Sequence, residues 1–177
     1  MVSRRIEYGS LSFTLPEGYS VLEEASLFAP RNGADQDTGV PGPPVTVTLV
    51  GTAAHPDVPD YSESASDMKP GAYPSSITLS IKEQGEPPMA FLHNMEKVMK
   101  SHFAGYKIHF IENAWIGEHP AARSQSTLES HFRIFRLNYA WHMKRELATA
   151  CLTVTASGVK EGWSSLRDFA VSASISA

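Results

Sequence analysis

The second half of the chain, residues 75–177, switches between two hydrophobic periods, and this switching most constrains the fold. Ile77, Leu79 and Ile81 recur at every second position, which is the period of a strand with one buried face. A helical period follows over residues 87–104, and the strand period then returns several times. This order predicts one largely antiparallel sheet with helices packed on it. The predicted fold class is therefore α+β, an α/β/α sandwich.

The predicted helix has sequence signals at both ends. Pro87 and Pro88 follow Glu86 at its start, where the missing backbone N–H of proline is not needed. Gly105 follows its last turn and is expected to act as the C-terminal cap. One side of the helix is apolar, with Leu92, Met95, Met99 and Phe103, widened by Phe91 and Val98. A methionine-rich side can bind partners, but methionine at such positions more often fills a core, and core packing is the prediction.

Four strands and a second helix are predicted after this helix. The strands cover residues 106–110 (extending toward Trp115), 122–128, 135–143 and 148–155. In the third of these, alternate residues form one apolar face, namely Phe135, Leu137, Tyr139, Trp141 and Met143. Residues 161–170 have a helical pattern, and residues 171–175 are expected to return to the edge of the sheet.

The first half predicts a hairpin followed by a long insertion. Residues 11–15 alternate like a strand, and residues 16–18 (PEG) have turn chemistry. Residues 19–28 are expected to form the returning strand, with a helix over residues 22–25 (LEEA) as the alternative. Residues 30–74 are rich in proline, glycine and acidic residues, with one short strand at 45–50. Loops of this length are usually functional or mobile, and mobility is the commoner case. We therefore expect a single domain, 1–177, with a Pro/Gly-rich insertion at about 30–74.

Composition and charge exclude several classes of protein. The 177 residues carry a net charge of −4, which argues against a nucleic-acid binder, because such a protein needs a basic surface. Cys151 is the only cysteine, so no disulfide can form within the chain. The first residues lack the apolar run of a signal peptide, and no segment is long and apolar enough to span a membrane. The expectation is a soluble cytoplasmic protein.

The sequence shows no set of residues that would predict catalysis, a metal or a cofactor. The histidines at 102, 109, 119, 131 and 142 lack metalloenzyme spacing, and no Gly-x-Ser-x-Gly elbow or Gly-rich phosphate loop is present. Cys151 lies inside a predicted strand, where a packed inert thiol is commoner than a reactive one. Four carboxylates in the insertion, Asp57, Asp60, Glu63 and Asp67, do not have the spacing of a calcium loop.

A polar face of the predicted sheet is the remaining candidate site. Small and hydroxyl-bearing side chains dominate it, and such a face is common in half-solvated antiparallel sheets. It would also suit a partner helix that needs close approach and hydrogen bonds. The candidate partner-binding residues are Thr78, Ser80, Arg136, Asn138, His142, Thr149 and Thr153.

Several segments together resemble the PsbP/DcrB-like family. They are residues 11–19 (LSFTLPEGY), 75–83 (SSITLSIKE), 86–88 (EPP), 117–123 (GEHPAAR) and 152–157 (LTVTAS). The resemblance covers most of the chain outside residues 30–74. These are packing and turn motifs, so they inform the fold more than the function.

The resemblance implies a non-enzymatic binding protein. The family includes lumenal photosystem proteins, periplasmic lipoproteins, Ran-binding proteins and small cytosolic chaperones of type VI secretion effectors. With no signal peptide or lipobox, the chain looks most like the chaperones, which hold the hydrophobic N-terminal segment of an effector. This implies an effector as partner, and the exposed edges and face of such a sheet predict a homodimer. A Ran-type small-GTPase binding protein, or an accessory binding protein of the PsbP-like fold, is the alternative, and a histidine-based hydrolase or metalloprotein is a more distant one.

Overall fold

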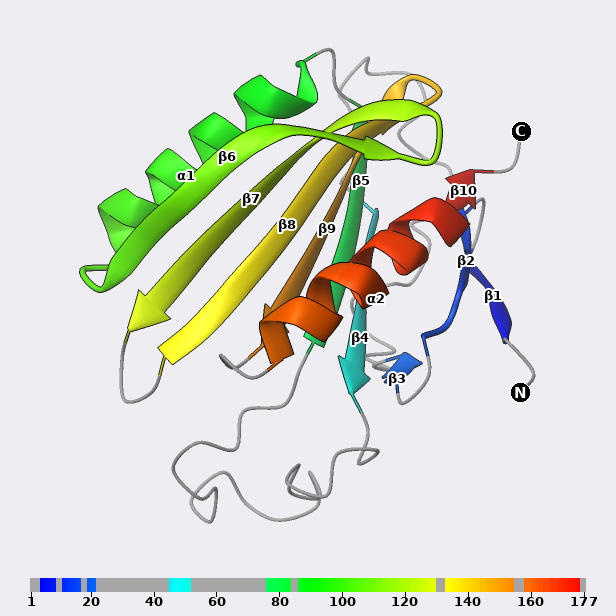
Figure 1. The fold of residues 1–177 in the computed structure, drawn as a ribbon. Helices are drawn as coiled ribbons and strands as arrows, with labels where there is room; N and C mark the ends of the chain where they lie inside the picture. Colours follow the sequence, from blue (N-terminus) through cyan, green and yellow to red (C-terminus); the bar gives the residue numbers. More distant parts are fainter. Residues whose placement is uncertain are drawn as a thin grey trace, which may run out of the picture.

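Two antiparallel sheets and two helices make up the described part of the chain (Figure 1). The structure is a computed structural model, and it describes residues 4–8, 11–16, 19–21, 45–51, 76–83, 86–129, 133–154 and 158–175. The small sheet has the order β1-β2-β10, with β1 Arg5–Tyr8, β2 Leu11–Thr14 and β10 Ser174–Ile175. The predicted α+β class is confirmed.

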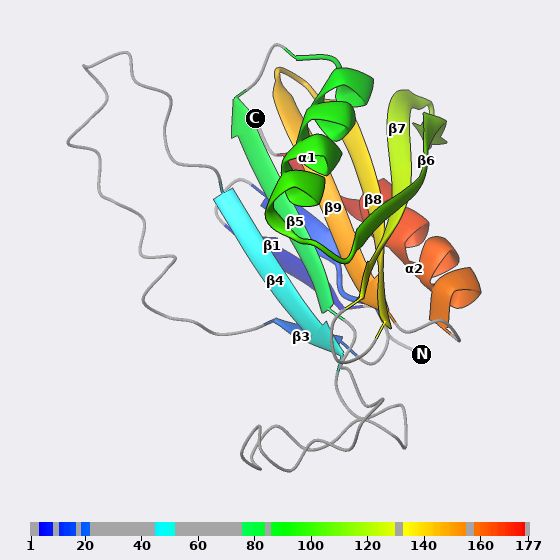
Figure 2. The same cartoon turned by 90° about the vertical axis from the view of Figure 1, so that its left-hand side faces the viewer.

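The main sheet has seven strands in the order β3-β4-β5-β9-β8-β7-β6. Its first three strands are β3 Tyr19–Val21, β4 Val45–Gly51 and β5 Ser76–Glu83. The other four form a meander of β6 Tyr106–Ile116, β7 His119–Glu129, β8 Arg133–Met143 and β9 Glu146–Val154. The helix α1, Pro88–His102, connects β5 with β6, and α2, Val159–Ser172, follows β9. Figure 2 shows the two helices on opposite faces of this sheet.

Tight turns fix the register of the meander. Gly117 has φ +57° between β6 and β7, and Lys144 has φ +56° between β8 and β9. A left-handed residue is what a two-residue hairpin turn needs to match the twist of its strands. Consecutive strands therefore pair directly.

Gly105 is required for a reason other than the expected one. It lies beside the end of β7, and the Glu129 N–H donates to the Gly105 carbonyl at 3.1 Å. A Cβ on Gly105 would come within 2.2 Å of the Glu129 carbonyl oxygen. Its φ is not among the positive values, so the glycine permits a close approach of two backbones rather than a left-handed cap.

The face of the main sheet toward α2 is the core. Leu137, Tyr139 and Trp141 are buried on β8, which confirms the predicted apolar face of this strand. Leu166 and Phe169 of α2 cover it. The small sheet completes the cover, because Phe13 lies against Phe169 with ring centroids 5.4 Å apart.

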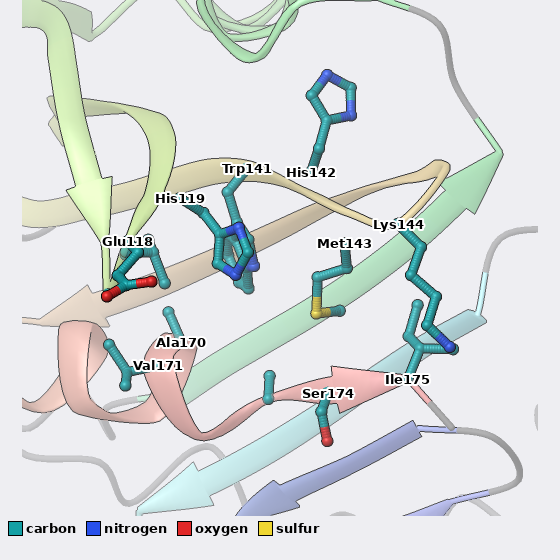
Figure 3. Close-up of a pocket in the computed structure, with 13 residues that line it drawn as sticks. Glu118, His119, Trp141, His142, Met143, Lys144, Ala170, Val171, Ser174 and Ile175 are labelled. Carbon is teal, nitrogen blue, oxygen red and sulfur yellow. The ribbon is translucent and has the colours of Figure 1, made fainter. Parts of the chain in front are cut away.

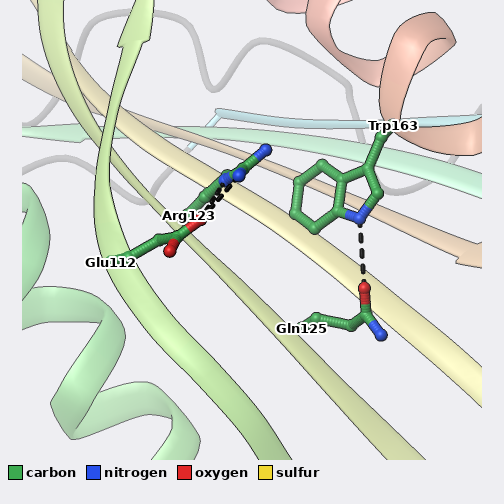
Figure 4. A network of polar contacts seen from close by, with 4 residues as sticks. All are labelled: Glu112, Arg123, Gln125 and Trp163. Carbon is green, nitrogen blue, oxygen red and sulfur yellow. Dashed lines mark hydrogen bonds and ion pairs between the residues drawn. The ribbon is translucent and has the colours of Figure 1, made fainter. Parts of the chain in front are cut away.

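A polar and aromatic contact fixes the first half of α2 on β6 and β7 (Figure 4). The indole N–H of Trp163 donates to Gln125 Oε1 at 3.1 Å. The Arg123 guanidinium lies 5.2 Å from the Trp163 ring and pairs with Glu112 at 2.6 Å. The cation over the ring and the indole hydrogen bond together hold the helix against the edge of the sheet.

Two predicted strand pairings are wrong. The predicted hairpin of residues 11–15 with 19–28 does not form, since β2 pairs with β1 and β10 while β3 pairs with β4. Residues 22–28 lie outside the described residues. The chain end at Ser174–Ile175 pairs with β2 in the small sheet and not with the edge of the main sheet. Alternation indicates a strand and its buried face, but it does not select the partner strand.

Candidate functional site

The helix α1 covers only part of the second face of the main sheet. Most of its contacts are with β6, β7 and β8, whereas β5 and β9 form the neighbouring part of this face. At the start of the helix, Phe91 reaches toward β5, where Lys82 Nζ lies 4.2 Å from the ring centroid. On β5 and β9 the helix packs against the row of Lys82 and Leu147, and the rest of these two strands lies away from its main contacts.

The pairing register brings the predicted partner-binding residues to this one face. Arg136 pairs with Thr153, and Thr153 with Ser76, in one row across three strands. The next rows are Asn138–Cys151–Thr78 and Ala140–Thr149–Ser80. His142 pairs with Leu147 in the row after these. Directly paired residues point to the same side of a sheet, so all seven candidates share the α1 side: Thr78, Ser80, Arg136, Asn138, His142, Thr149 and Thr153.

The part of this face that lies away from the main contacts of α1 carries small, mostly polar side chains in the described residues. We call it the β5–β9 strip and define it by Ser76, Thr78, Ser80, Thr149, Cys151 and Thr153. All six are partly exposed. The Ser76 and Thr153 hydroxyls bond to each other at 2.8 Å, and the Thr149 hydroxyl reaches the Ser80 carbonyl at 3.5 Å.

An apolar side of α1 borders the strip. Phe91, Met95 and Val98 follow one another at helical spacing and so lie on one side of the helix. The contact of Phe91 with Lys82 turns that side toward β5. Val98 is 54% exposed, while Phe91 and Met95 are partly buried. The predicted core packing of this helix is thus confirmed for Leu92, which is fully buried, but not for Val98 or the exposed Phe103.

Beneath α1 lies a buried polar network centred on Glu96. The Glu96 side chain is completely buried. Its Oε1 accepts hydrogen bonds from the Ser124 hydroxyl at 2.5 Å and from Asn138 Nδ2 at 3.1 Å, and its Oε2 accepts from the Tyr106 hydroxyl at 2.6 Å. These bonds offset the cost of removing a carboxylate from water.

Asn138 belongs to this network and not to the β5–β9 strip. It is 2% exposed, and its Nδ2 also donates to the Ser124 hydroxyl at 3.1 Å. Its Oδ1 is buried and has no hydrogen-bond partner among the described residues. While α1 stays in place, it separates Asn138 from a partner that docks on the strip. Asn138 therefore contributes to this face only through its buried hydrogen bonds.

Arg136 links the network to the strip. Its Nη1 donates to the Tyr106 hydroxyl at 3.0 Å, and its Nη2 lies 3.6 Å from Cys151 Sγ. Burial and the bond to Glu96 raise the pKa of Tyr106 to about 12. Burial also raises the pKa of the Cys151 thiol, although the charge of Arg136 opposes this. Both groups are therefore protonated near neutral pH, which suits a packed hydrogen-bond network better than an activated nucleophile.

Two of the described histidines make separate local contacts. His102 Nδ1 lies 2.8 Å from the Val98 carbonyl, and His109 Nε2 lies 3.0 Å from the Thr127 hydroxyl. His131 and the four carboxylates of the insertion lie outside the described residues. Among the residues that are described, no three His, Cys, Asp or Glu side chains gather as metal ligands. No described helix is long and apolar enough to cross a membrane.

A cavity of about 360 Å³ lies elsewhere, at the tips of the two hairpin turns and the end of α2 (Figure 3). Trp141 and Met143 line it, whereas the His142 side chain points to the other side of β8. Glu118 and Lys144 lie at opposite ends of the cavity in Figure 3. His119 also lines the cavity, and no ion pair joins Glu118 to His119 or Lys144, so these described groups do not form an acid–base pair.

Sequence comparison and structural comparison give different results for this chain. No family model and no curated protein match it. Among solved structures it is similar to LpqN of Mycobacterium tuberculosis, which is involved in cell envelope biogenesis, with a TM-score of 0.58 and 12% identity over 99% of this chain and 91% of the other. It is also similar to the cyanobacterial PsbP (CyanoP) of Synechocystis sp. PCC 6803, with a TM-score of 0.57 and 13% identity over 99% and 94% of the two chains.

A weaker likeness is to TplEi of Pseudomonas aeruginosa, a type VI secretion immunity protein solved with a peptide. Its TM-score is 0.46, with 13% identity over 73% of this chain and 47% of the other. A likeness of this strength carries no weight for function. The similarity to CyanoP and LpqN, in contrast, spans nearly the whole chain at very low identity, and so it speaks for architecture alone. The chain has the PsbP-like fold that the sequence motifs predicted.

Proposed function

We propose that this protein is a non-catalytic binding protein that holds an apolar segment of another polypeptide. The observation that carries the proposal is the half-covered sheet face, where the β5–β9 strip lies beside the apolar side of α1. Two kinds of surface meet there, one with small hydroxyl groups and one with apolar side chains. A flat polar sheet without the apolar border would offer much less to such a segment.

The two surfaces suit different sides of one docked helix. Small residues on the strip allow a helix backbone to approach closely, and their hydroxyls can bond its polar groups. The side of α1 formed by Phe91, Met95 and Val98 can contact the apolar side chains of the same segment. A segment that is insoluble alone would thereby lose much of its exposure to water.

Within this proposal, the partner is the apolar N-terminal segment of a type VI secretion effector, and the protein is its cytoplasmic chaperone or adaptor. The family resemblance supports this choice. The described residues contain no cluster of three or more His, Cys, Asp or Glu side chains that could hold a metal, which fits it. The proposal includes a homodimer of the empty protein, since β6 pairs on one side only within the described sheet and its Trp115 is 63% exposed.

The test is co-expression with the protein encoded beside this one in its genome. We expect the neighbour to co-purify and to be soluble only in the presence of this protein. Thr78→Glu and Thr153→Glu should each reduce the recovered complex at least about tenfold, because a charge on the strip would be desolvated without a partner. Ser164→Glu, on an exposed position of α2, is the matched control and should leave the complex unchanged.

Two results would contradict the proposal. One is a neighbour that is equally soluble alone and does not co-purify. The other is a complex that forms but is unaffected by both glutamate substitutions, which would place the contact on another surface. A pull-down that depends on the nucleotide state of a small GTPase would instead support the Ran-type alternative.

A further inference from the structure

Arg136 stands at the edge of the β5–β9 strip with hydrogen-bonding capacity left over. It pairs with Thr153 across the sheet, and the Thr153 hydroxyl bonds to that of Ser76. A guanidinium has five N–H donors. Nη1 and Nη2 each make one contact, and Nε makes none with the described residues.

The contacts of Arg136 are with neutral groups. The acceptors are the Tyr106 hydroxyl and the Cys151 thiol, both of which stay protonated near neutral pH. No described carboxylate lies within ion-pair distance of Arg136. The nearby Glu96 reaches it only through Tyr106, and both Glu96 oxygens already accept hydrogen bonds.

Two other arginines of the sheet show the contrast. Arg123 pairs with Glu112 at 2.6 Å, and Arg133 pairs with Glu129 at 2.5 Å. Arg133 is well exposed, yet it has a carboxylate, while the more buried Arg136 has none among the described residues. A partly desolvated guanidinium without a carboxylate is poorly compensated, and a carboxylate that arrives from outside can form a bidentate pair with it.

We infer that Arg136 binds a carboxylate of the docked segment, so that the preferred partner is an apolar segment with one Asp or Glu. This inference rests on the proposed function and adds the chemistry of the partner to it. The strip accommodates the small and apolar residues, and Arg136 fixes the position of the acidic one. An acidic residue in an otherwise apolar segment is costly to bury alone, and a pair with Arg136 offsets part of that cost.

Selection from a displayed library of random 16-residue peptides tests the inference even while the natural partner is unidentified. The wild-type protein should enrich apolar peptides that carry one Asp or Glu at a constant place. Arg136→Gln should still enrich apolar peptides but lose the acidic preference. Arg133→Gln is the matched control, since it removes an arginine from the same strand and should leave the preference intact.

A pair of synthetic peptides then measures the size of the effect. The best selected peptide and its Asp→Asn or Glu→Gln version should differ about tenfold in affinity for the wild type, and less than about twofold for Arg136→Gln. Arg136→Lys should give an intermediate ratio, because it keeps the charge but not the planar fork. The wild-type comparison needs no protein variant, so it remains decisive even if Arg136→Gln does not fold.

The outcomes separate the two proposals. Failure to enrich any apolar peptide would overturn the proposed function. Enrichment of apolar peptides with no acidic preference, or equal binding of the acidic and amide peptides by the wild type, would overturn the role of Arg136 and leave the proposed function standing.

Discussion

The two faces of the main sheet are built on the same strands but differ in side-chain composition and in how far a helix covers them. Toward α2, the side chains are large and apolar, and α2 and the small sheet cover them completely around Trp141 and Leu137. Toward α1, most side chains are small or polar, and the helix covers mainly β6 to β8 and the Leu147 end of β9. The first face holds the fold together, whereas the second keeps part of its surface available.

The difference lies in how each helix is fixed. Burial of apolar side chains such as Leu166 and Phe169 attaches α2 to the sheet. In contrast, α1 combines a small apolar cluster around Leu92 with the hydrogen bonds of Glu96. Hydrogen bonds need defined geometry, so they fix the position of a helix without a large buried area. The remaining sheet can then stay uncovered.

The largest expected effect on stability comes from Trp141→Ala on the face toward α2. Trp141 is 1% exposed in the core, so its loss leaves a cavity and removes a large apolar contact. We expect the free energy of unfolding to fall by about 3–5 kcal/mol in urea denaturation. Trp115→Ala removes the same side chain from an exposed position and should change it by no more than about 0.5 kcal/mol. Similar losses for both would mean that the α2 face is not the main core.

Glu96→Leu tests how α1 is held. The substitution places an apolar side chain on the side of α1 that faces the sheet. It leaves the Ser124, Tyr106 and Asn138 donors without their acceptor. Buried donors without partners should lower the free energy of unfolding by about 2–3 kcal/mol. Glu112→Leu is the control, since Glu112 is exposed and its ion pair with Arg123 is worth less than about 1 kcal/mol. A neutral or stabilising Glu96→Leu would show that packing alone positions α1.

The smallest expected effect is the contribution of the Tyr106 hydroxyl to the free energy of unfolding, and this contribution depends on pH. Tyr106→Phe removes one hydrogen bond to Glu96 and should cost about 1 kcal/mol at pH 7. Since the pKa of Tyr106 is raised from 10.0 to about 12 in the folded state, its neutral form is favoured by folding. This contribution is complete below pH 10 and is lost as the pH rises toward and through 12.

The measurement is urea denaturation of the wild type and Tyr106→Phe from about pH 7 to 12. The difference between them should be constant below pH 10 and decrease above it. A difference that grows above pH 10 would mean that the ionised form of Tyr106 is the one favoured by folding, and the hydrogen bond to Glu96 would have to be reconsidered.

The hydrophobic period of the sequence was enough to predict much of the secondary structure of this protein. It located both helices, the meander and the apolar face of β8, because period depends only on local backbone geometry. It also placed Thr78, Thr149 and Thr153 on one face, since the strands that carry them pair directly. A further signal was available in Glu96, which stands in the apolar stripe one turn after Leu92. A charge at such a position indicates a buried partner on the sheet.

Only the tertiary structure decided which strands meet and what covers them. The pairing of β2 with β10, and of β3 with β4, joins segments far apart in the chain, and period 2 is the same whichever strand lies alongside. Asn138 and Thr153 look alike in a strand pattern, yet one is buried beneath α1 and the other lies beside it. Because α1 contacts only some strands of the sheet, its position, and not the strand sequence, divides this face into a buried and an accessible part.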